Sequence, residues 1–105
     1  MKYKKDILKN YKFIKADIVR LKDLIIDADN GERLKLEKQI REKERAIARV
    51  DNALTVLNKR EEYIIRATLL NGMSISEVGE ILHLSDRSIY SIRYKAFKKM
   101  DKYLG

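Results

Sequence analysis

The feature that most restricts the fold of this chain is a regular spacing of apolar residues in its first 28 positions. Apolar side chains recur at alternating intervals of four and three residues, at Ile7, Tyr11, Ile14, Ile18, Leu21, Ile25 and Ala28. This is the heptad pattern of a helix that packs along one face against a second helix. Since the chain contains no proline that would interrupt it, the spacing predicts one long amphipathic helix.

A second stretch with the same pattern follows a predicted turn at Asp29, Asn30 and Gly31. Asn and Gly tolerate left-handed backbone, so these residues are typical of a helix end followed by a tight reversal. The pattern resumes if Lys43 also occupies the seam, with Leu36, Ile40, Ile47, Val50, Leu54 and Leu57. Two helices of about 26 residues, each about 39 Å long, predict an antiparallel, coiled-coil-like hairpin over residues 1–57.

The first helix carries more apolar side chains than one seam covers. Outside the seam lie Leu8, Phe13, Val19, Leu24 and Ile26. We expect two hairpins to pair, so that residues 1–57 form a homodimer or higher homo-oligomer. The alternative is that these side chains pack on the rest of the chain in one bundle. In either case Lys43 in the seam would set register rather than add stability.

Residues 58–105 predict three helices with clear start signals. Asn58 followed by Glu61, and Ser74 followed by Glu77, form capping-box patterns that begin the first two helices. Ser85 caps a third helix, whose inward positions are Ile89, Ile92, Ala96, Met100 and Tyr103. A short middle helix and a turn before the last helix are the layout of a helix-turn-helix. The expected fold class is therefore all-α.

Two residues near the predicted turn have expected structural roles. His83 stands where the chain reverses, and we expect it to adopt unusual backbone angles there. Gly79 lies in the short middle helix, where the missing side chain would let a neighbouring segment approach closely.

The composition excludes several classes of function. The chain has 105 residues, no Cys and one His, so it has no disulfide framework, no thiolate zinc site and no expected metal or cofactor. It lacks a Gly-rich phosphate loop, an acid pair near a His, and a nucleophile with a base, so we do not expect an enzyme. It has neither a membrane-length apolar run nor a secretory signal, which predicts no membrane partner and a cytoplasmic location.

The net charge of +8 suits a polyanionic partner, and its position in the chain matters. Residues 58–86 hold three bases and five acids, whereas residues 87–103 hold six bases and one acid. At 100° per residue, the side of the third helix away from its apolar face carries Arg87, Tyr90, Ser91, Tyr94, Lys95 and Lys98. Such side chains bind base edges and phosphates, which favours double-stranded DNA. The alternative is a solvated helix end whose lysines complement the helix dipole.

These residues match a known pattern. The shared positions are Arg60-Glu61, Gly72, Glu77-Val78-Gly79, Ser85, Ile89, Ile92, Ala96 and Lys99. In this pattern, residues 57–102 resemble region 4 of bacterial sigma factors, the module that reads the −35 promoter element. Residues 1–56 do not resemble the parts of a sigma factor that melt the promoter. A short coiled segment before such a module is similar to small bacteriophage transcriptional regulators of the ArpU/RinA kind.

The resemblance and the helix geometry together predict the DNA contacts. The expected base-reading residues are Arg87, Ser88, Tyr90, Ser91 and Tyr94. The expected backbone contacts are Ser74, Ser76, Lys95 and Lys98, although helix capping explains the two serines equally well. The order Asp86-Arg87 is the reverse of that usual in sigma factors, so the preferred DNA should differ from the ordinary −35 hexamer. Arg93 lies near the apolar face, and we expect it to pair with Glu61 or Glu62.

The sequence thus predicts a DNA-binding transcriptional regulator, with residues 1–57 for oligomerisation and residues 58–105 for DNA. Two alternatives belong to other classes. The chain could dock on RNA polymerase through its region-4-like module, or it could be a small phage DNA-packaging subunit of the terminase kind.

Overall fold

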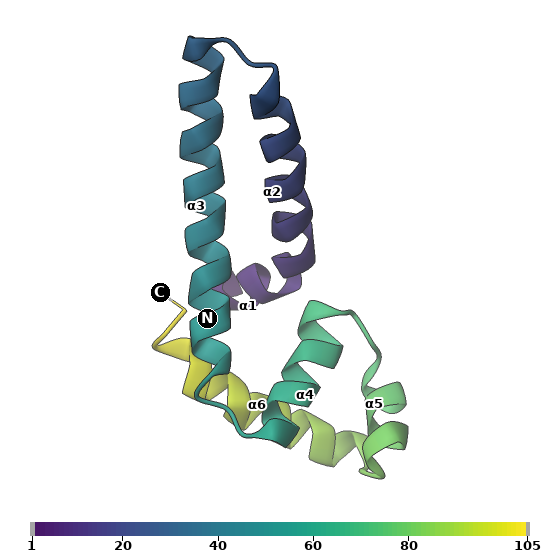
Figure 1. Ribbon diagram of the computed structural model, residues 1–105. Helices are drawn as coiled ribbons and strands as arrows, with labels where there is room; N and C mark the ends of the chain where they lie inside the picture. The colour runs from purple at the N-terminus through teal and green to yellow at the C-terminus, as the bar shows by residue number, and fades with distance from the viewer. Residues whose placement is uncertain (1, 105) are drawn as a thin grey trace.

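The computed structural model describes residues 2–104, which form helices and turns with no strand in that range. The expected all-α fold with a C-terminal helix-turn-helix is therefore confirmed. The elements are α1 (Lys2–Lys9), α2 (Tyr11–Ile26), α3 (Asn30–Leu54), α4 (Lys59–Ile65), the π-helical turn η1 (Arg66–Leu70), α5 (Ile75–Leu82) and α6 (Asp86–Asp101). Figure 1 shows α2 and α3 as a hairpin that extends away from the other helices.

The antiparallel hairpin of α2 and α3 agrees with the heptad prediction. Its seam buries Leu21 and Ile40. The Lys43 ammonium lies 3.5 Å from the Asp17 carboxylate. This ion pair links the two helices beside the apolar seam, which is consistent with a role of Lys43 in register.

Two details of the predicted hairpin are wrong. The first helix is not continuous, because Asn10 (φ −92°, ψ 0°) separates α1 from α2. The turn also differs, because Asn30 and Gly31 are the first residues of α3 and do not end α2. Asp29 begins α3 as its N-cap, with its carboxylate accepting a hydrogen bond from the Glu32 N–H at 2.9 Å. An Asp side chain at this position accepts one of the free N–H groups of the first turn, which favours the start of a helix here over a left-handed end of α2.

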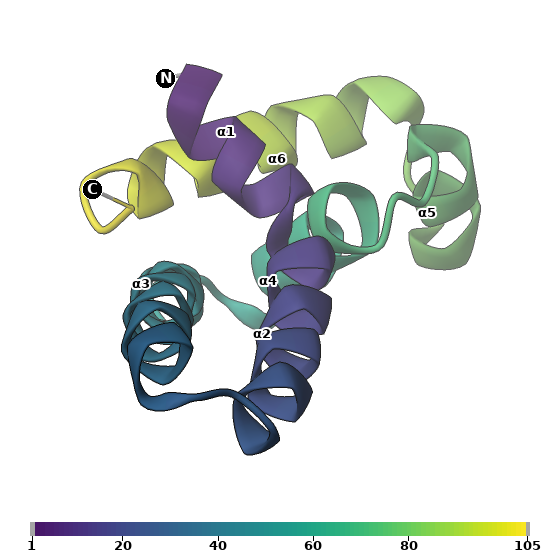
Figure 2. The same cartoon turned by 90° about the horizontal axis from the view of Figure 1, so that it is seen from above.

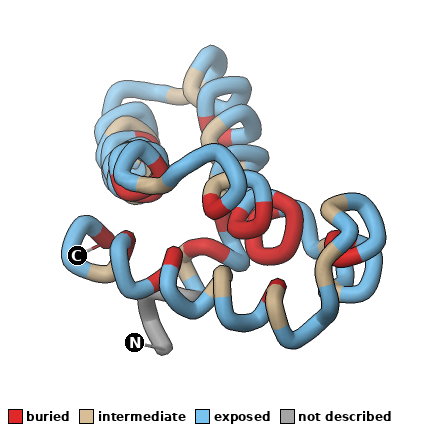
Figure 3. The backbone as a smooth tube through the Cα atoms, turned by 90° about the horizontal axis from the view of Figure 1, so that it is seen from below, coloured by how far each residue is buried: buried red, intermediate tan, exposed pale blue. Residues whose placement is uncertain are grey.

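Helix α1 packs against the C-terminal helices and crosses α6 (Figure 2). Leu8 is fully buried there, in one apolar cluster with Phe97, Met100 and Leu104. The Tyr11 hydroxyl adds a 2.6 Å hydrogen bond to Asp51 in α3. Figure 3 shows that buried residues concentrate where the base of the hairpin meets these helices. The packing therefore joins the two predicted parts of the chain across residue 57.

Leu8 is the one member of the surplus apolar set that this packing covers. Phe13, Val19, Leu24 and Ile26 remain between 50% and 70% exposed. The intramolecular alternative thus accounts for Leu8 and leaves an apolar surface on the hairpin.

Helices α4, α5 and α6 form the helix-turn-helix around a second apolar cluster that includes Ile64, Val78 and Ile89. Both predicted capping boxes are present, at Asn58 with Glu61 and at Ser74 with Glu77. These reciprocal hydrogen bonds satisfy free N–H groups at the start of α4 and α5.

The turn between α5 and α6 depends on two residues. His83 adopts left-handed backbone (φ 58°, ψ 42°) and ends α5, as predicted. Gly79 faces the turn so closely that a Cβ there would lie 2.6 Å from the Leu84 carbonyl oxygen. The Leu84 N–H also donates a 2.9 Å hydrogen bond to the Gly79 carbonyl. The absence of a side chain at Gly79 therefore sets how near the turn lies to α5.

One predicted core position on α6 is wrong. Tyr103 is 38% exposed, and it lies beyond the end of the helix at Asp101. Phe97 and Leu104 are buried instead. Because the helix ends early, helical spacing no longer applies at residue 103, and the turn directs Leu104 inward.

Candidate nucleic-acid interface

The start of α6 is held in place by hydroxyl groups. Ser85 is the N-cap, and its hydroxyl accepts the Ser88 N–H at 3.2 Å. One turn away, the Ser76 hydroxyl donates to the Asp86 carboxylate at 3.3 Å and so links α5 to α6. Arg87 follows Asp86, and its side chain is exposed. The structure therefore presents an exposed guanidinium at the N-terminus of α6, the end at which the helix dipole favours anions.

Four of the predicted contact residues form a line along the outward side of α6. Arg87, Ser91, Tyr94 and Lys98 recur at intervals of four, three and four residues, and all four are exposed. At 100° per residue they fall within about 60°, on the opposite side from Ile89, Ala96 and Met100. The structure thus brings a guanidinium, a hydroxyl, a phenol and an ammonium together on one accessible surface.

The other predicted base readers flank this line. Ser88 is half-buried, and its hydroxyl is engaged with that of Ser85 at 3.1 Å. Tyr90 is 54% exposed. Lys95 is exposed on the same side of the helix as Ser88. Helical spacing places Ser88 and Tyr90 about 80° to either side of the centre, so both lie at the edges of the surface.

The prediction for Arg93 is wrong. Its guanidinium lies 5.2 Å from the centre of the Tyr90 ring, a cation–π arrangement, rather than against Glu61 or Glu62. The Arg66 side chain donates a 2.8 Å hydrogen bond to the Glu62 carboxylate instead. This bond raises the pKa of Arg66, although burial of the guanidinium acts to lower that pKa. A second cation–π contact joins Lys98 to Tyr94 at 4.9 Å. The three- and four-residue spacings of these pairs were the signal that could have identified them.

The two N-terminal serines of α5 have structural partners. The Ser74 hydroxyl accepts the Glu77 N–H at 3.1 Å as part of the capping box. Ser76 is held by Asp86, as described above. Both remain exposed, so the structure accounts for their capping and linking roles while leaving their hydroxyl groups accessible.

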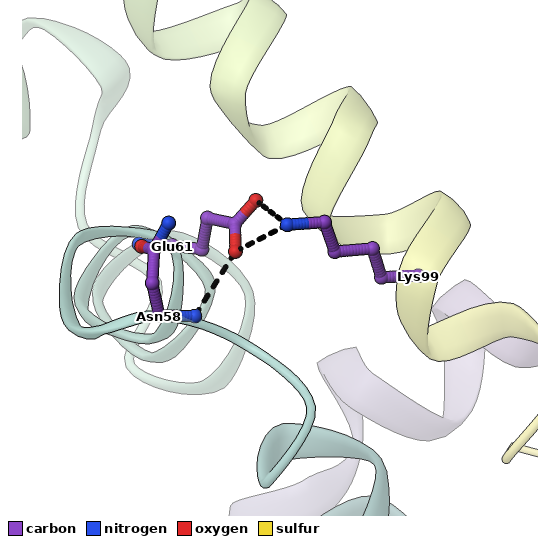
Figure 4. Close-up of polar contacts among 3 residues, drawn as sticks. All are labelled: Asn58, Glu61 and Lys99. Atoms are coloured by element: carbon purple, nitrogen blue, oxygen red, sulfur yellow. Dashed lines mark hydrogen bonds and ion pairs between the residues drawn. The ribbon is translucent and has the colours of Figure 1, made fainter.

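Glu61 and Lys99 attach α6 to the start of α4, as Figure 4 shows. The Lys99 ammonium lies 2.8 Å and 3.0 Å from the two carboxylate oxygens of Glu61, which also accept the Asn58 N–H. Burial by itself raises the pKa of Glu61, but the Lys99 and Asn58 hydrogen bonds outweigh it and lower that pKa. No local sequence pattern predicts this pair, because its members are 38 residues apart.

The described residues 2–104 show neither a candidate metal site nor a membrane-spanning helix. They contain no cluster of three or more His, Cys, Asp or Glu side chains suited to a metal ion. Within the same range, every helix is too short or too polar to cross a membrane.

The geometry of the helix-turn-helix is matched by a family comparison. The family model described as "Sigma-70, region 4" matches residues 47–100, which is a little over half of the chain. The chain belongs to the sigma-70 region 4 family. Membership makes residues 47–100 a DNA-binding helix-turn-helix module of the transcription apparatus. Compared with curated proteins and with solved structures, the chain shows no significant match.

The region 4 match begins earlier than the sequence analysis placed it. It starts at Ile47, inside α3, whereas the motif residues were traced only from residue 57. The last turns of α3 carry Val50, Ala53 and Leu54, all buried in the cluster that includes Phe97 and Met100. The region 4 module therefore uses the end of the hairpin as part of its own core.

Proposed function

We propose that this protein is a sequence-specific transcriptional regulator that reads double-stranded promoter DNA with α6 and has no catalytic activity. The observation that carries the proposal is the exposed line of Arg87, Ser91, Tyr94 and Lys98 on the last helix of a region 4 module. Such a regulator acts where the DNA is, in the cytoplasm. Its place among phage regulators of the ArpU/RinA kind belongs to the same proposal and rests on the short helical segment before the module.

The line from Arg87 to Lys98 is longer than the major groove of B-DNA is wide. Arg87 and Lys98 are eleven residues apart, which is about 16 Å along a helix. The major groove of B-DNA is about 12 Å wide. A helix that places Arg87 against base edges therefore carries Lys98 beyond the groove, to the phosphate backbone. We assign base reading to Arg87 and Ser91, with Ser88, Tyr90 and Tyr94 beside them, and backbone contact to Lys95 and Lys98. Ser74 and Ser76 have hydroxyl groups available to the same backbone.

The test separates base reading from backbone binding. After bound sites are selected from random DNA, Arg87→Ala and Lys98→Ala are compared on a panel of single-base variants of the selected site. Arg87→Ala should lose about 1–3 kcal/mol on the selected site and relax preference at one base pair. Lys98→Ala should weaken all sequences alike and reduce the salt slope by about one.

The matched control is Lys38→Ala, since Lys38 is an exposed lysine of α3. It should leave affinity, preference and salt slope close to those of the unchanged protein. Equal, uniform losses for Arg87→Ala and Lys98→Ala across the panel would contradict the assigned orientation of α6. Absence of any selected sequence would contradict sequence-specific reading.

Membership in the region 4 family also favours contact with RNA polymerase, which is the second candidate function. A polymerase-docking protein would bind polymerase without DNA, and it would tolerate Arg87→Ala in that assay. A DNA-packaging subunit would instead assemble as a ring. Polymerase pull-down without DNA and measurement of the native mass distinguish these alternatives from a promoter-binding regulator.

We further propose that the regulator is a homodimer assembled through the hairpin. The support is the exposed apolar set of Phe13, Val19, Leu24, Ile26 and Leu34, because large apolar side chains gathered on one projecting element are typical of an interaction surface. Sedimentation at tens of micromolar should show a dimer. A monomer at that concentration would contradict this part of the proposal.

A further inference from the structure

The exposed apolar side chains of α2 lie on two different flanks of that helix. Helical spacing places Val19 and Ile26 on one flank and Phe13 and Leu24 on the other, about 120° to 160° apart. Phe13 borders a hollow shared with Thr68, Leu69 and Leu70 of η1. Val19 borders a groove whose lining residues all come from the hairpin. The Val19 flank is therefore open to a partner without involvement of helices α4 to α6.

The groove beside Val19 has an apolar floor and charged edges. Its apolar lining is Ile18, Val19, Ile47 and Ala48, and its edges include Lys15 and Glu44. Glu44 lies 3.9 Å from Lys22 of α2, so charges of both signs are present along the groove. An apolar strip with mixed charges beside it is the surface that coiled-coil helices present to one another.

The charges that flank Val19 on its own side of α2 differ in sign. Lys12 and Lys15 come before Val19, and Asp23 comes after it. A second copy laid alongside in the same direction would bring like charges together. Laid in the opposite direction, it would bring a lysine of one copy against an aspartate of the other.

These charged residues lie on the same face of α2 as Val19. Lys12, Lys15, Val19, Asp23 and Ile26 follow one another at intervals of three, four, four and three residues, so they share one face of α2. In an antiparallel pair centred on Val19, Lys15 lies four residues before the centre and Asp23 four residues after it. Lys15 would therefore face Asp23 of the partner subunit, and the symmetry would repeat the contact.

We propose that two copies of this chain associate through the Val19 flank of α2, antiparallel, with a two-fold axis near Val19. This assignment rests on the proposed dimer and specifies its face and direction. Such an interface is isologous, because one surface patch meets itself across the axis. It places the two region 4 modules at opposite ends of the paired hairpins, with both α6 surfaces free for DNA.

The absence of native cysteine permits a direct test by single-cysteine cross-linking of the full chain. Val19→Cys should give a covalent dimer with a short bismaleimide, because the two copies of this position meet at the axis. Phe13→Cys is the matched control, since Phe13 is 61% exposed and Val19 is 63% exposed. Its yield should be several-fold lower. Equal yields, or a higher yield from Phe13→Cys, would overturn the assignment.

Charge exchange tests the direction. Lys15→Asp and Asp23→Lys should each weaken the dimer in sedimentation, and the double variant should recover it, since both contacts then have opposite signs again. No recovery in the double variant would overturn the antiparallel arrangement. A monomeric wild-type protein would contradict the proposed dimer itself. A wild-type dimer that Val19→Cys does not cross-link would contradict only the proposed interface at Val19. DNA binding, measured separately, reports on neither.

Discussion

Replacing Gly79 by alanine offers a sharp test of how α5 supports the turn before α6. An added Cβ would lie 2.6 Å from the Leu84 carbonyl oxygen, whereas ordinary contacts begin near 3.4 Å. The turn would have to move by about 0.8 Å, and overpacking of this kind costs about 1–3 kcal/mol. Alanine regains about 0.5–1 kcal/mol of helix propensity. The expected net change is therefore a loss of up to about 2.5 kcal/mol of unfolding free energy.

Gly31→Ala is the matched control, because Gly31 also lies in a helix. Its added Cβ would meet only the Asp29 carboxylate at 3.6 Å, an ordinary contact. This variant should be neutral or stabilised by up to about 1 kcal/mol. Thermal unfolding followed by circular dichroism separates the two, since 1 kcal/mol shifts Tm by about 4–8 °C in a domain near this size. If Gly79→Ala raises Tm as Gly31→Ala does, the Leu84 carbonyl does not lie as close to Gly79 as the structure places it.

Three other predictions concern the core, the ion pair and the basic surface. Leu8→Ala should cost about 2–5 kcal/mol in urea unfolding, while Leu34→Ala, at an exposed position, should change stability by less than about 0.5 kcal/mol; equal effects would mean that α1 does not pack on α6. The pKa of Glu61 is lower in the folded than in the unfolded chain. Ionised Glu61 therefore stabilises the fold above the unfolded pKa of about 4.3, and this stabilisation is lost as the pH falls through the folded pKa. Glu61→Gln should therefore lower the urea midpoint at pH 7 and reduce its fall in acid, and an unchanged acid profile would count against the Lys99 pair. DNA affinity should fall steeply with salt, with a log–log slope of about −4.5 to −7 for five to eight phosphate contacts, and a flat response would indicate that the lysines of α6 are only solvated.

The sequence alone was sufficient for the elements whose signals are local. The capping boxes at Asn58 and Ser74 and the cap at Ser85 lie within three or four residues of the groups that they satisfy. Heptad spacing predicted the hairpin, and helical spacing of the apolar residues along α6 predicted its outward side. Such signals survive without tertiary context because both partners of each interaction are neighbours in the chain.

Local signals also misled where a distant segment decided the outcome. The heptad spacing from Ile7 onward predicted one helix, yet the chain turns at Asn10 so that Leu8 can enter the core beside Phe97. Leu8 is fully buried in that cluster, and no residue near Leu8 in the sequence indicates the distant side chains with which it packs.

The pairing of charges was likewise decided by the tertiary structure. From spacing alone, Arg93 was assigned to Glu61 or Glu62, but Lys99 reaches Glu61 and Arg66 reaches Glu62. Helix periodicity predicts the side of a helix on which a residue lies. The angle at which two helices cross determines which of their side chains come into contact. That angle is set by close packing of the whole core. The outward, basic side of α6 could therefore be predicted from its sequence, whereas the contacts that hold α6 in place emerged only from the fold.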